Sequence, residues 1–168
     1  MVVTLWHGQK RAIRRGEEPP MTTPATLAPR LAELAEEFEA VGPSDRLQLL
    51  VELAAELPGL PPHMTHDSML AVPECQSPLF LAVEITEAQR VRLYFDAPRE
   101  APTTRGLAAI LHTGLDGEPV TTVLGTPDDF YVQLRLTDAV SPLRLRGAAA
   151  MLARIKRAVR GGLPHHLR

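Results

Sequence analysis

Two helices are predicted by the hydrophobic pattern of residues 27–57. Apolar residues recur at three- and four-residue steps over residues 27–41, which places them on one face of a helix. Gly42-Pro43 ends this helix, and Ser44 is a suitable N-cap for the next one. The two apolar stripes consist of Leu27, Leu31, Leu34, Phe38 and Val41, followed by Leu47, Leu50, Val51 and Ala54.

The pattern changes to that of β-strands further along the chain. Residues 79–85 are almost continuously apolar, as expected of a strand that is buried on both faces. Residues 90–96 alternate, with Val91, Leu93 and Phe95 on one side of a second strand. The residues TEAQ between the two runs have the length of a hairpin loop, and residues 69–72 predict a further short strand.

Helices are predicted again in the last part of the chain. One is capped near Thr103 or Thr104, runs to His112 and is closed by Gly114. A short helix begins at Thr126, and a long one runs from Ser141 to Arg160. The order of elements predicts an α+β fold, in which a small antiparallel sheet of about three strands is packed with flanking helices.

Length and composition indicate one domain over residues 26–162. We expect residues 1–25 to be a disordered leader and residues 163–168 to be a flexible tail. The chain of 168 residues is 45% hydrophobic but only 4% aromatic, so its core is expected to consist of aliphatic side chains. No run approaches the roughly 20 apolar residues of a membrane span, and the N-terminus lacks the apolar run of a secretory signal.

Charge and residue types argue against several classes of partner. The formal net charge of −2 provides no bulk attraction to nucleic acid or to an anionic membrane. Cations on the last predicted helix are interpreted as a solvated face, since few aromatic residues are available to stack on bases. They are Arg144, Arg146, Arg154, Lys156, Arg157 and Arg160. His165-His166 alone does not make a metal site, so we expect no bound metal, no nucleic acid and no membrane.

The only cysteine of the chain, Cys75, lies in the segment VPECQSPLF. A single cysteine provides no disulfide framework, which favours a cytoplasmic location. A free cysteine is often an inert buried hydrophobe, but the neighbours here are turn-forming and polar. A thiol on a stiff loop anchored by strands is positioned for chemistry.

Two kinds of thiol chemistry stay open at this point. A cysteine hydrolase needs a histidine beside its nucleophile, and His66 and His112 are the plausible partners of Cys75. A single-cysteine redox sensor or thiol peroxidase-like protein needs only one thiol of low pKa. Sulfenic acid formation at low peroxide concentration is the observation that favours this second reading.

Three segments resemble the SufE family of sulfur-acceptor proteins. VPECQSPLFL resembles the cysteine-loop signature of that family, with Val72, Cys75, Gln76, Ser77 and Leu81 identical. EAPTTRGLAAIL, residues 100–111, resembles the start of a family helix. LTDAVSPLRLRGAAAMLARIK, residues 136–156, resembles the C-terminal helix signature and includes Gly147. The similarity spans about residues 27–160, and the segments occur in the family order.

The resemblance implies a SufE-like fold and the role of an accessory carrier rather than a stand-alone enzyme. Such a protein accepts sulfane sulfur as a persulfide on Cys75 from a SufS-type cysteine desulfurase and activates that enzyme. It delivers the sulfur toward an iron–sulfur scaffold of the SufBCD type. Pyridoxal phosphate belongs to the desulfurase, so we expect no cofactor in this chain.

Supporting residues are implied by the same resemblance. Arg144 and Arg105 are the candidate cations for the thiolate or the partner, and Glu100 matches an acidic family position near the cysteine loop. Gln76 and Ser77 are expected to shape the loop through hydrogen bonds from side chain to backbone.

The loop departs from the family pattern at one position, and the resemblance also implies a resting place for its cysteine. Glu74 stands where many members have glycine, and its carboxylate is expected to raise the pKa of the neighbouring thiol. In this family the resting cysteine is expected to lie against the core and to swing out when the desulfurase docks. We expect Leu79, Phe80 and Met69 to line that shelter.

Overall fold

The computed structural model of the protein describes residues 26–162 and confirms the α+β class. Its α-helices are α1 (Pro29–Glu39), α2 (Pro43–Glu56), α3 (Pro102–Leu115), α4 (Val120–Leu124), α5 (Phe130–Gln133) and α6 (Pro142–Gly162). The strands are β1 (Leu70–Ala71), β2 (Phe80–Ile85) and β3 (Val91–Asp96), and two short 3-10 helices are η1 (His66–Ser68) and η2 (Leu136–Asp138). The expected leader and tail lie outside the described residues.

The sheet is antiparallel with the strand order β1-β2-β3. Phe80 pairs with Asp96 at one end of the β2–β3 hairpin and Ile85 with Val91 at the other. Gln89 in the connecting turn has a φ of 56°, which a tight hairpin turn requires. The alternation predicted for β3 is confirmed, because Val91, Leu93 and Phe95 are buried whereas Arg92 is exposed.

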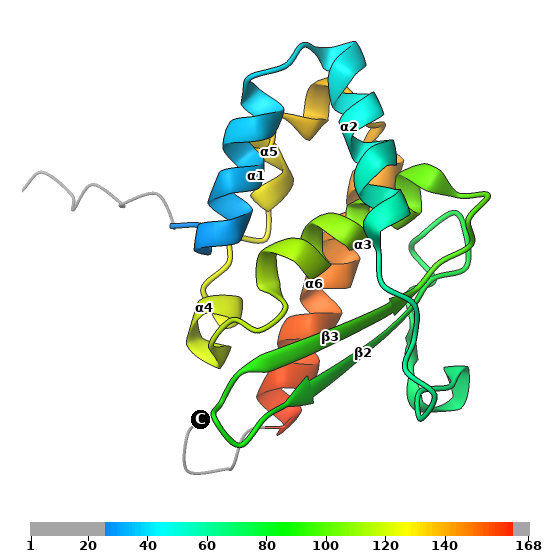
Figure 1. Ribbon diagram of the computed structural model, residues 1–168, viewed down its shortest axis with the longest axis vertical. Helices are drawn as coiled ribbons and strands as arrows, with labels where there is room; N and C mark the ends of the chain where they lie inside the picture. The colour runs from blue at the N-terminus through cyan, green and yellow to red at the C-terminus, as the bar shows by residue number, and fades with distance from the viewer. Residues whose placement is uncertain (1–25, 163–168) are drawn as a thin grey trace, which may run out of the picture.

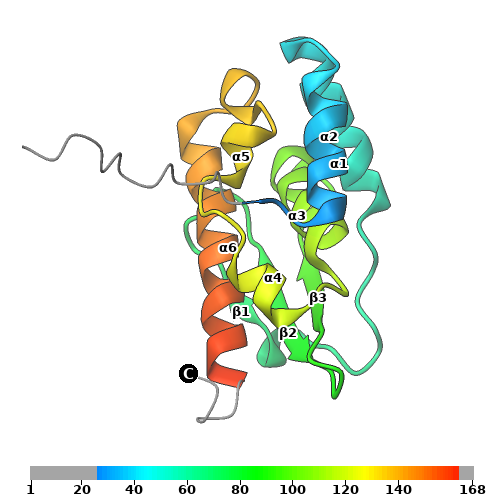
Figure 2. The same cartoon turned by 90° about the vertical axis from the view of Figure 1, so that its left-hand side faces the viewer.

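Helices cover one face of the hairpin. Figure 1 shows β2 and β3 crossing in front of α6, and Figure 2 shows α6 as a long helix beside the sheet, with α1 and α2 on the opposite side of α3. Helix α3 lies at the centre of the core and packs tightly on both N-terminal helices. A methyl group on Gly106 would lie 2.4 Å from the backbone oxygen of Leu50, and one on Gly114 would lie 2.8 Å from the Leu31 side chain.

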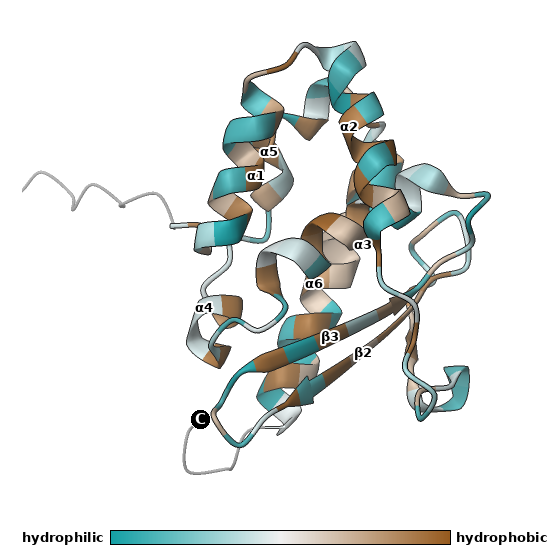
Figure 3. Ribbon diagram, viewed as in Figure 1, coloured by the Kyte–Doolittle hydropathy of each residue, from teal (hydrophilic) through white to brown (hydrophobic). Residues whose placement is uncertain are grey.

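Helix α2 differs in detail from the prediction. It begins at Pro43 with Gly42 as its N-cap, so Ser44 lies inside the first turn rather than before it. Leu47 and Val51 are 43% and 37% exposed, whereas Leu50, Leu53 and Ala54 are buried. The buried stripe is therefore rotated relative to the predicted one. Figure 3 shows α1 and α2 alternating between hydrophilic and hydrophobic residues, while α3 is largely hydrophobic.

Two further predictions about helix ends are wrong. Gly114 does not close α3, which continues to Leu115; the left-handed residue that follows is Gly117, with a φ of 81°. Thr126 does not begin a helix, because residues 125–129 form the turn between α4 and α5. Thr126 is instead buried in that turn, and its hydroxyl donates a hydrogen bond to the Thr122 carbonyl.

The outer face of the sheet carries a second, smaller apolar cluster. Met64 and Met69, from the connection between α2 and β1, are buried against Ala82 of β2. Leu60, Phe80 and Tyr94 pack around them. Within residues 26–162, no helix is long and apolar enough to cross a membrane.

Candidate functional site

The cysteine loop, residues 73–78, connects β1 to β2. At its base the Val72 N–H donates to the Leu79 carbonyl at 2.9 Å, and both side chains are buried. The Cys75 N–H donates to the Val72 carbonyl at 3.1 Å. Because its ends are anchored in the core and its first turn is hydrogen-bonded, the loop holds the thiol at a defined place.

Helix α6 forms the surface on which the thiol lies. A methyl group in place of the Gly147 hydrogen would lie 3.0 Å from the Cys75 Sγ and 3.6 Å from its Cα. A contact of 3.0 Å is closer than side-chain carbons normally come, so a side chain at position 147 would displace the thiol by a few tenths of an ångström. Cys75 is half-buried there and packs against the main hydrophobic core.

A second contact joins the loop to α6 further along the same helix. Arg154 donates from Nη1 to the Glu74 Oε2 at 2.9 Å and from Nη2 to Oε1 at 3.1 Å. Gly147 and Arg154 are seven residues apart, which is close to two helical turns, so they lie on one face of α6. The cysteine loop is thus held at Cys75 and at the residue before it.

The thiol is protonated in this resting arrangement. The pKa of Cys75 is raised from an ordinary value of 9.0 to about 11; burial is the largest cause, the adjacent Glu74 carboxylate also raises it, and Arg154 lowers it. The effect that the sequence predicted for Glu74 is confirmed in direction, but burial is the larger cause. A resting Cys75 is therefore a poor nucleophile at neutral pH.

The shelter of the thiol differs from the predicted one. Leu79 belongs to the same core cluster as Cys75, as expected. Met69 and Phe80 instead belong to the small cluster on the outer face of the sheet. Successive residues of a strand point to opposite faces, which separates Phe80 from Leu79. Helix α6 takes the place that the sequence assigned to Met69 and Phe80.

Gln76 is exposed and Ser77 is half-buried in the loop. In the part of the chain that the structure describes, the loop is held by backbone hydrogen bonds and by the Glu74 side chain rather than by these two side chains. The expectation that their own hydrogen bonds shape the loop is not met in this state. Their contribution to sulfur transfer stays a prediction.

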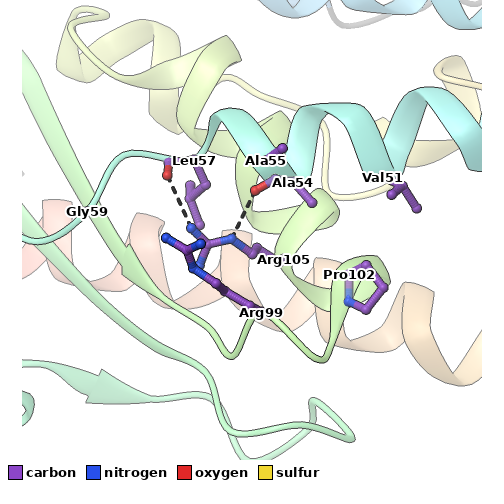
Figure 4. A pocket seen from close by; sticks show the side chains of 8 residues that line it. All are labelled: Val51, Ala54, Ala55, Leu57, Gly59, Arg99, Pro102 and Arg105. Atoms are coloured by element: carbon purple, nitrogen blue, oxygen red, sulfur yellow. Dashed lines mark hydrogen bonds between the residues drawn. The ribbon is translucent and has the colours of Figure 1, made fainter.

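Arg105 lies at the start of α3 and is bonded to the backbone around the end of α2. Its guanidinium donates to the carbonyls of Ala54 at 2.9 Å, Leu57 at 3.2 Å and Ala97 at 2.7 Å. Figure 4 shows it beside Arg99 in the cleft below α2, with the bonds to Ala54 and Leu57 dashed. Two of these carbonyls are at the C-terminal end of α2, where helix carbonyls lack partners. The contacts of Arg105 are those of a structural cap.

Arg144 and Glu100 are both exposed. Arg144 lies in the first turn of α6, three residues before Gly147, which puts it on the face of the helix that carries the cysteine loop. Glu100 lies in the turn before α3. Neither forms an ion pair within residues 26–162, so both are available to a partner.

The two histidines considered as partners of Cys75 are engaged elsewhere. His66 pairs with Asp96 and stacks on Phe80, with ring centroids 4.0 Å apart. His112 is half-buried beside Asp116, and burial lowers its pKa. The groups that act on the Cys75 thiol are Glu74 and Arg154 instead. The geometry of a cysteine–histidine pair is therefore not formed here.

The cations predicted to form a solvated face of α6 are not equivalent. Arg154 binds Glu74, and Lys156 is buried and donates to Asp128 at 2.6 Å. The others, Arg144, Arg146, Arg157 and Arg160, are exposed. Within residues 26–162, no group of three or more His, Cys, Asp or Glu side chains is placed to hold a metal ion. His165 and His166 lie outside the described residues.

Sequence reasoning missed the roles of Gly147 and Arg154. Gly147 occurs in a recognised motif, but a glycine inside a helix has no partner that the sequence names. Arg154 is 80 residues from Glu74, so their pairing depends on the folded chain. The only available signal was the helical spacing of Arg144, Gly147 and Arg154 on one face.

Fold and site together define a small α+β protein that holds one sheltered thiol on a loop supported by a helix. The family model described as "SufE: Fe-S metabolism associated domain" matches residues 32–159. This is more than half of the chain, and the match includes the cysteine loop and nearly all of α6. The protein belongs to the SufE family.

Similar proteins agree with this assignment. An uncharacterized SufE-like protein of Mycobacterium tuberculosis is 56% identical over 140 residues, which cover 83% of this chain and 98% of that protein. The chloroplastic/mitochondrial SufE-like protein 1 of Arabidopsis thaliana is 31% identical over 132 residues, covering 75% of this chain and 33% of its own. A solution structure of a hypothetical protein from Thermus thermophilus has a TM-score of 0.72 and 39% identity, covering 81% of this chain and 97% of its own.

Proposed function

We propose that this SufE-family protein accepts sulfane sulfur on Cys75 from a cysteine desulfurase of the SufS type and carries it toward iron–sulfur cluster assembly. The observation that carries the proposal is the placement of the thiol. Cys75 is half-buried at a loop that is held against α6 by close contact with Gly147 and by an ion pair. Such a thiol is protected at rest and becomes accessible when the loop moves.

The transfer is an exchange between a thiolate and a persulfide. Cys75 gives up its proton, and its thiolate attacks the outer sulfur of the donor persulfide. A bond forms between Cys75 Sγ and that sulfur, the S–S bond of the donor breaks, and the donor sulfur leaves as a thiolate that takes up a proton. The sum is redox-neutral, so the step requires neither a metal nor a second cysteine in this chain.

Docking of the desulfurase supplies what the resting site lacks. A thiol whose pKa is about 11 is almost entirely protonated at neutral pH. Burial is the largest cause of this raised pKa, so movement of Cys75 out of its shelter lowers it. The persulfide is then returned to the shelter on α6, away from bulk reductant.

The raised pKa separates this function from the alternative of a peroxide sensor. A sensor cysteine reacts as a thiolate in the free protein, so it needs a low pKa at rest. A sulfur acceptor needs its thiolate only when the donor is docked. The protonated resting state of Cys75 therefore favours the acceptor.

The test is a sulfide-release assay of a SufS-type desulfurase with free cysteine and a thiol reductant, in the presence of the wild-type protein or of Cys75→Ser. We expect the wild-type protein to stimulate the desulfurase and Cys75→Ser not to do so. Intact-protein mass spectrometry of a parallel mixture without the reductant should show that the wild type gains one sulfur atom and the variant none. Equal stimulation by both proteins, or no gain in mass at Cys75, would falsify the proposal.

A further inference from the structure

Within residues 26–162, one ion pair joins a side chain of the cysteine loop to the long helix α6. Glu74 and Arg154 meet through two parallel hydrogen bonds of 2.9 Å and 3.1 Å. Two-pronged pairs of arginine and carboxylate fix geometry as well as charge. The Arg154 side chain is 20% exposed and that of Glu74 is 45% exposed, so the arginine is anchored in the protein while the carboxylate faces solvent.

This arrangement makes the pair easy to open from one side. Arg154 projects from a continuous helix whose neighbours Leu152 and Ile155 are fully buried, so it stays in place. Glu74 lies in a turn of the loop, where exposure weakens the net free energy of an ion pair. If the pair opens, the part that moves is the loop that carries Cys75.

The position of the pair relative to the thiol decides what its opening does. Glu74 precedes Cys75 directly, and on α6 Arg154 follows Gly147 by seven residues, which is about 10 Å along the helix axis. While the pair is closed, it holds the loop down on one side of the contact between Cys75 and Gly147. When it is open, only that contact and the loop's own backbone bonds keep the thiol on α6.

We propose that Arg154 is a positioning residue for sulfur transfer, which holds Cys75 on α6 through Glu74 and releases the loop when Glu74 is drawn away. The role in transfer rests on the proposed function. Control of the loop and of thiol reactivity by the pair does not, because it is a property of this chain alone.

Opening the pair also changes the charge around the sulfur. The charged groups that act on Cys75 are Glu74 from its own loop and Arg154 from α6, and Arg157 of α6 acts in turn on Glu74. Glu74 raises the pKa of the thiol and Arg154 lowers it. Removing Glu74 from the site therefore leaves the arginine as a counter-ion for a thiolate or a persulfide. A cationic group on the docked donor is the chemistry that would draw Glu74 away.

Two measurements on the full-length protein separate the effect of the pair on loop position from its effect on ionisation of the thiol. Amide exchange of the Cys75 N–H, which is bonded to Val72, reports whether the loop is held. The pH profile of alkylation by iodoacetamide reports the ionisation of the thiol. The variants are Glu74→Gln, Arg154→Met, Arg154→Lys and the exchanged pair Glu74→Arg with Arg154→Glu. Arg146→Met, an exposed arginine of the same helix, is the control.

The two single variants are expected to shift the ionisation of the thiol in opposite directions but to loosen the loop in the same way. Glu74→Gln and Arg154→Met should each speed amide exchange by a few-fold, the loss expected from breaking an ion pair whose carboxylate is exposed. The midpoint of the alkylation profile should fall for Glu74→Gln and rise for Arg154→Met. Arg154→Lys should restore the midpoint but only part of the protection, because lysine cannot form both bonds.

The exchanged pair is the decisive variant. It should recover amide protection, since an arginine at 74 and a glutamate at 154 can form the same two bonds, while the alkylation midpoint stays below that of the wild type. If amide exchange is unchanged in every variant, or if the exchanged pair fails to recover it while remaining folded by circular dichroism, the proposal is wrong. No desulfurase is used, so this outcome is separate from a failure of sulfur transfer.

Discussion

Gly147 and Cys75 touch across the boundary between α6 and the cysteine loop, and there is no room for a side chain between them. A methyl group on Gly147 would lie 3.0 Å from the Cys75 Sγ. The loop is tethered through Glu74 and hydrogen-bonded at its base, so the sulfur is the part that can move aside. The resting position of the thiol therefore depends on the absence of a side chain at position 147 of α6.

Gly147→Ala is expected to push the thiol outward and to raise its rate of alkylation at neutral pH several-fold. Overpacking costs about 1–3 kcal/mol, but alanine gains about 1 kcal/mol over glycine in a helix, so the net loss of stability should be small. Gly161→Ala in the same helix is the matched control, because nothing lies within 4 Å of an added methyl group there. Equal alkylation rates of wild type and Gly147→Ala would show that Gly147 does not set the position of the sulfur.

The stability of the protein should fall with rising pH because of Cys75. Its pKa is about 11 in the folded protein against an ordinary value of 9.0, so the unfolded chain loses this proton first as the pH rises. The stabilising contribution is fully present below about pH 9 and is lost as the pH approaches about 11. Urea unfolding of wild type and Cys75→Ser across that range measures it.

The difference in unfolding free energy between these two proteins, wild type minus Cys75→Ser, should decrease with pH, since the other titrating groups are common to both. A difference that is constant from about pH 9 to about pH 11 would mean that the thiol titrates normally in the folded state.

Arg105→Met is expected to lower the free energy of unfolding by about 2–4 kcal/mol without changing the reactivity of Cys75. The substitution leaves the carbonyls of Ala54, Leu57 and Ala97 without their charged donor. Arg99→Met is the control, because this exposed arginine lines the same cleft and should change stability by less than about 0.5 kcal/mol. A shifted alkylation profile in Arg105→Met with unchanged stability would assign Arg105 to the thiol instead.

Arg144→Ala should weaken the proposed interaction with a SufS-type desulfurase and leave the fold intact. Arg144 is exposed on the α6 face that carries the cysteine loop, and a charge at the edge of an interface chiefly affects association. We expect the concentration for half-maximal stimulation to rise about tenfold, with little change in the maximal rate. Arg160→Ala, at the far end of the same helix, is the control. The same rise in both variants would point to a general charge effect.

The sequence by itself determined the class of fold and the family, and it indicated Cys75 as the candidate reactive residue. Helices and strands follow from local hydrophobic periodicity, which survives in the folded chain because each element buries one face. Cys75 was identifiable because a lone cysteine in a loop of turn-forming residues is visible without any knowledge of contacts.

Only the tertiary structure decided where the thiol lies and which groups surround it. The pairing of Glu74 with Arg154 and the approach of Gly147 to Cys75 join residues more than 70 positions apart in the sequence, and no local pattern encodes such contacts. The same holds for Arg105, which looked like a cation for the site and instead caps the end of α2. Burial and long-range pairing depend on how the helices pack against the sheet. The pKa and exposure of the Cys75 thiol therefore cannot be read from the residue types alone.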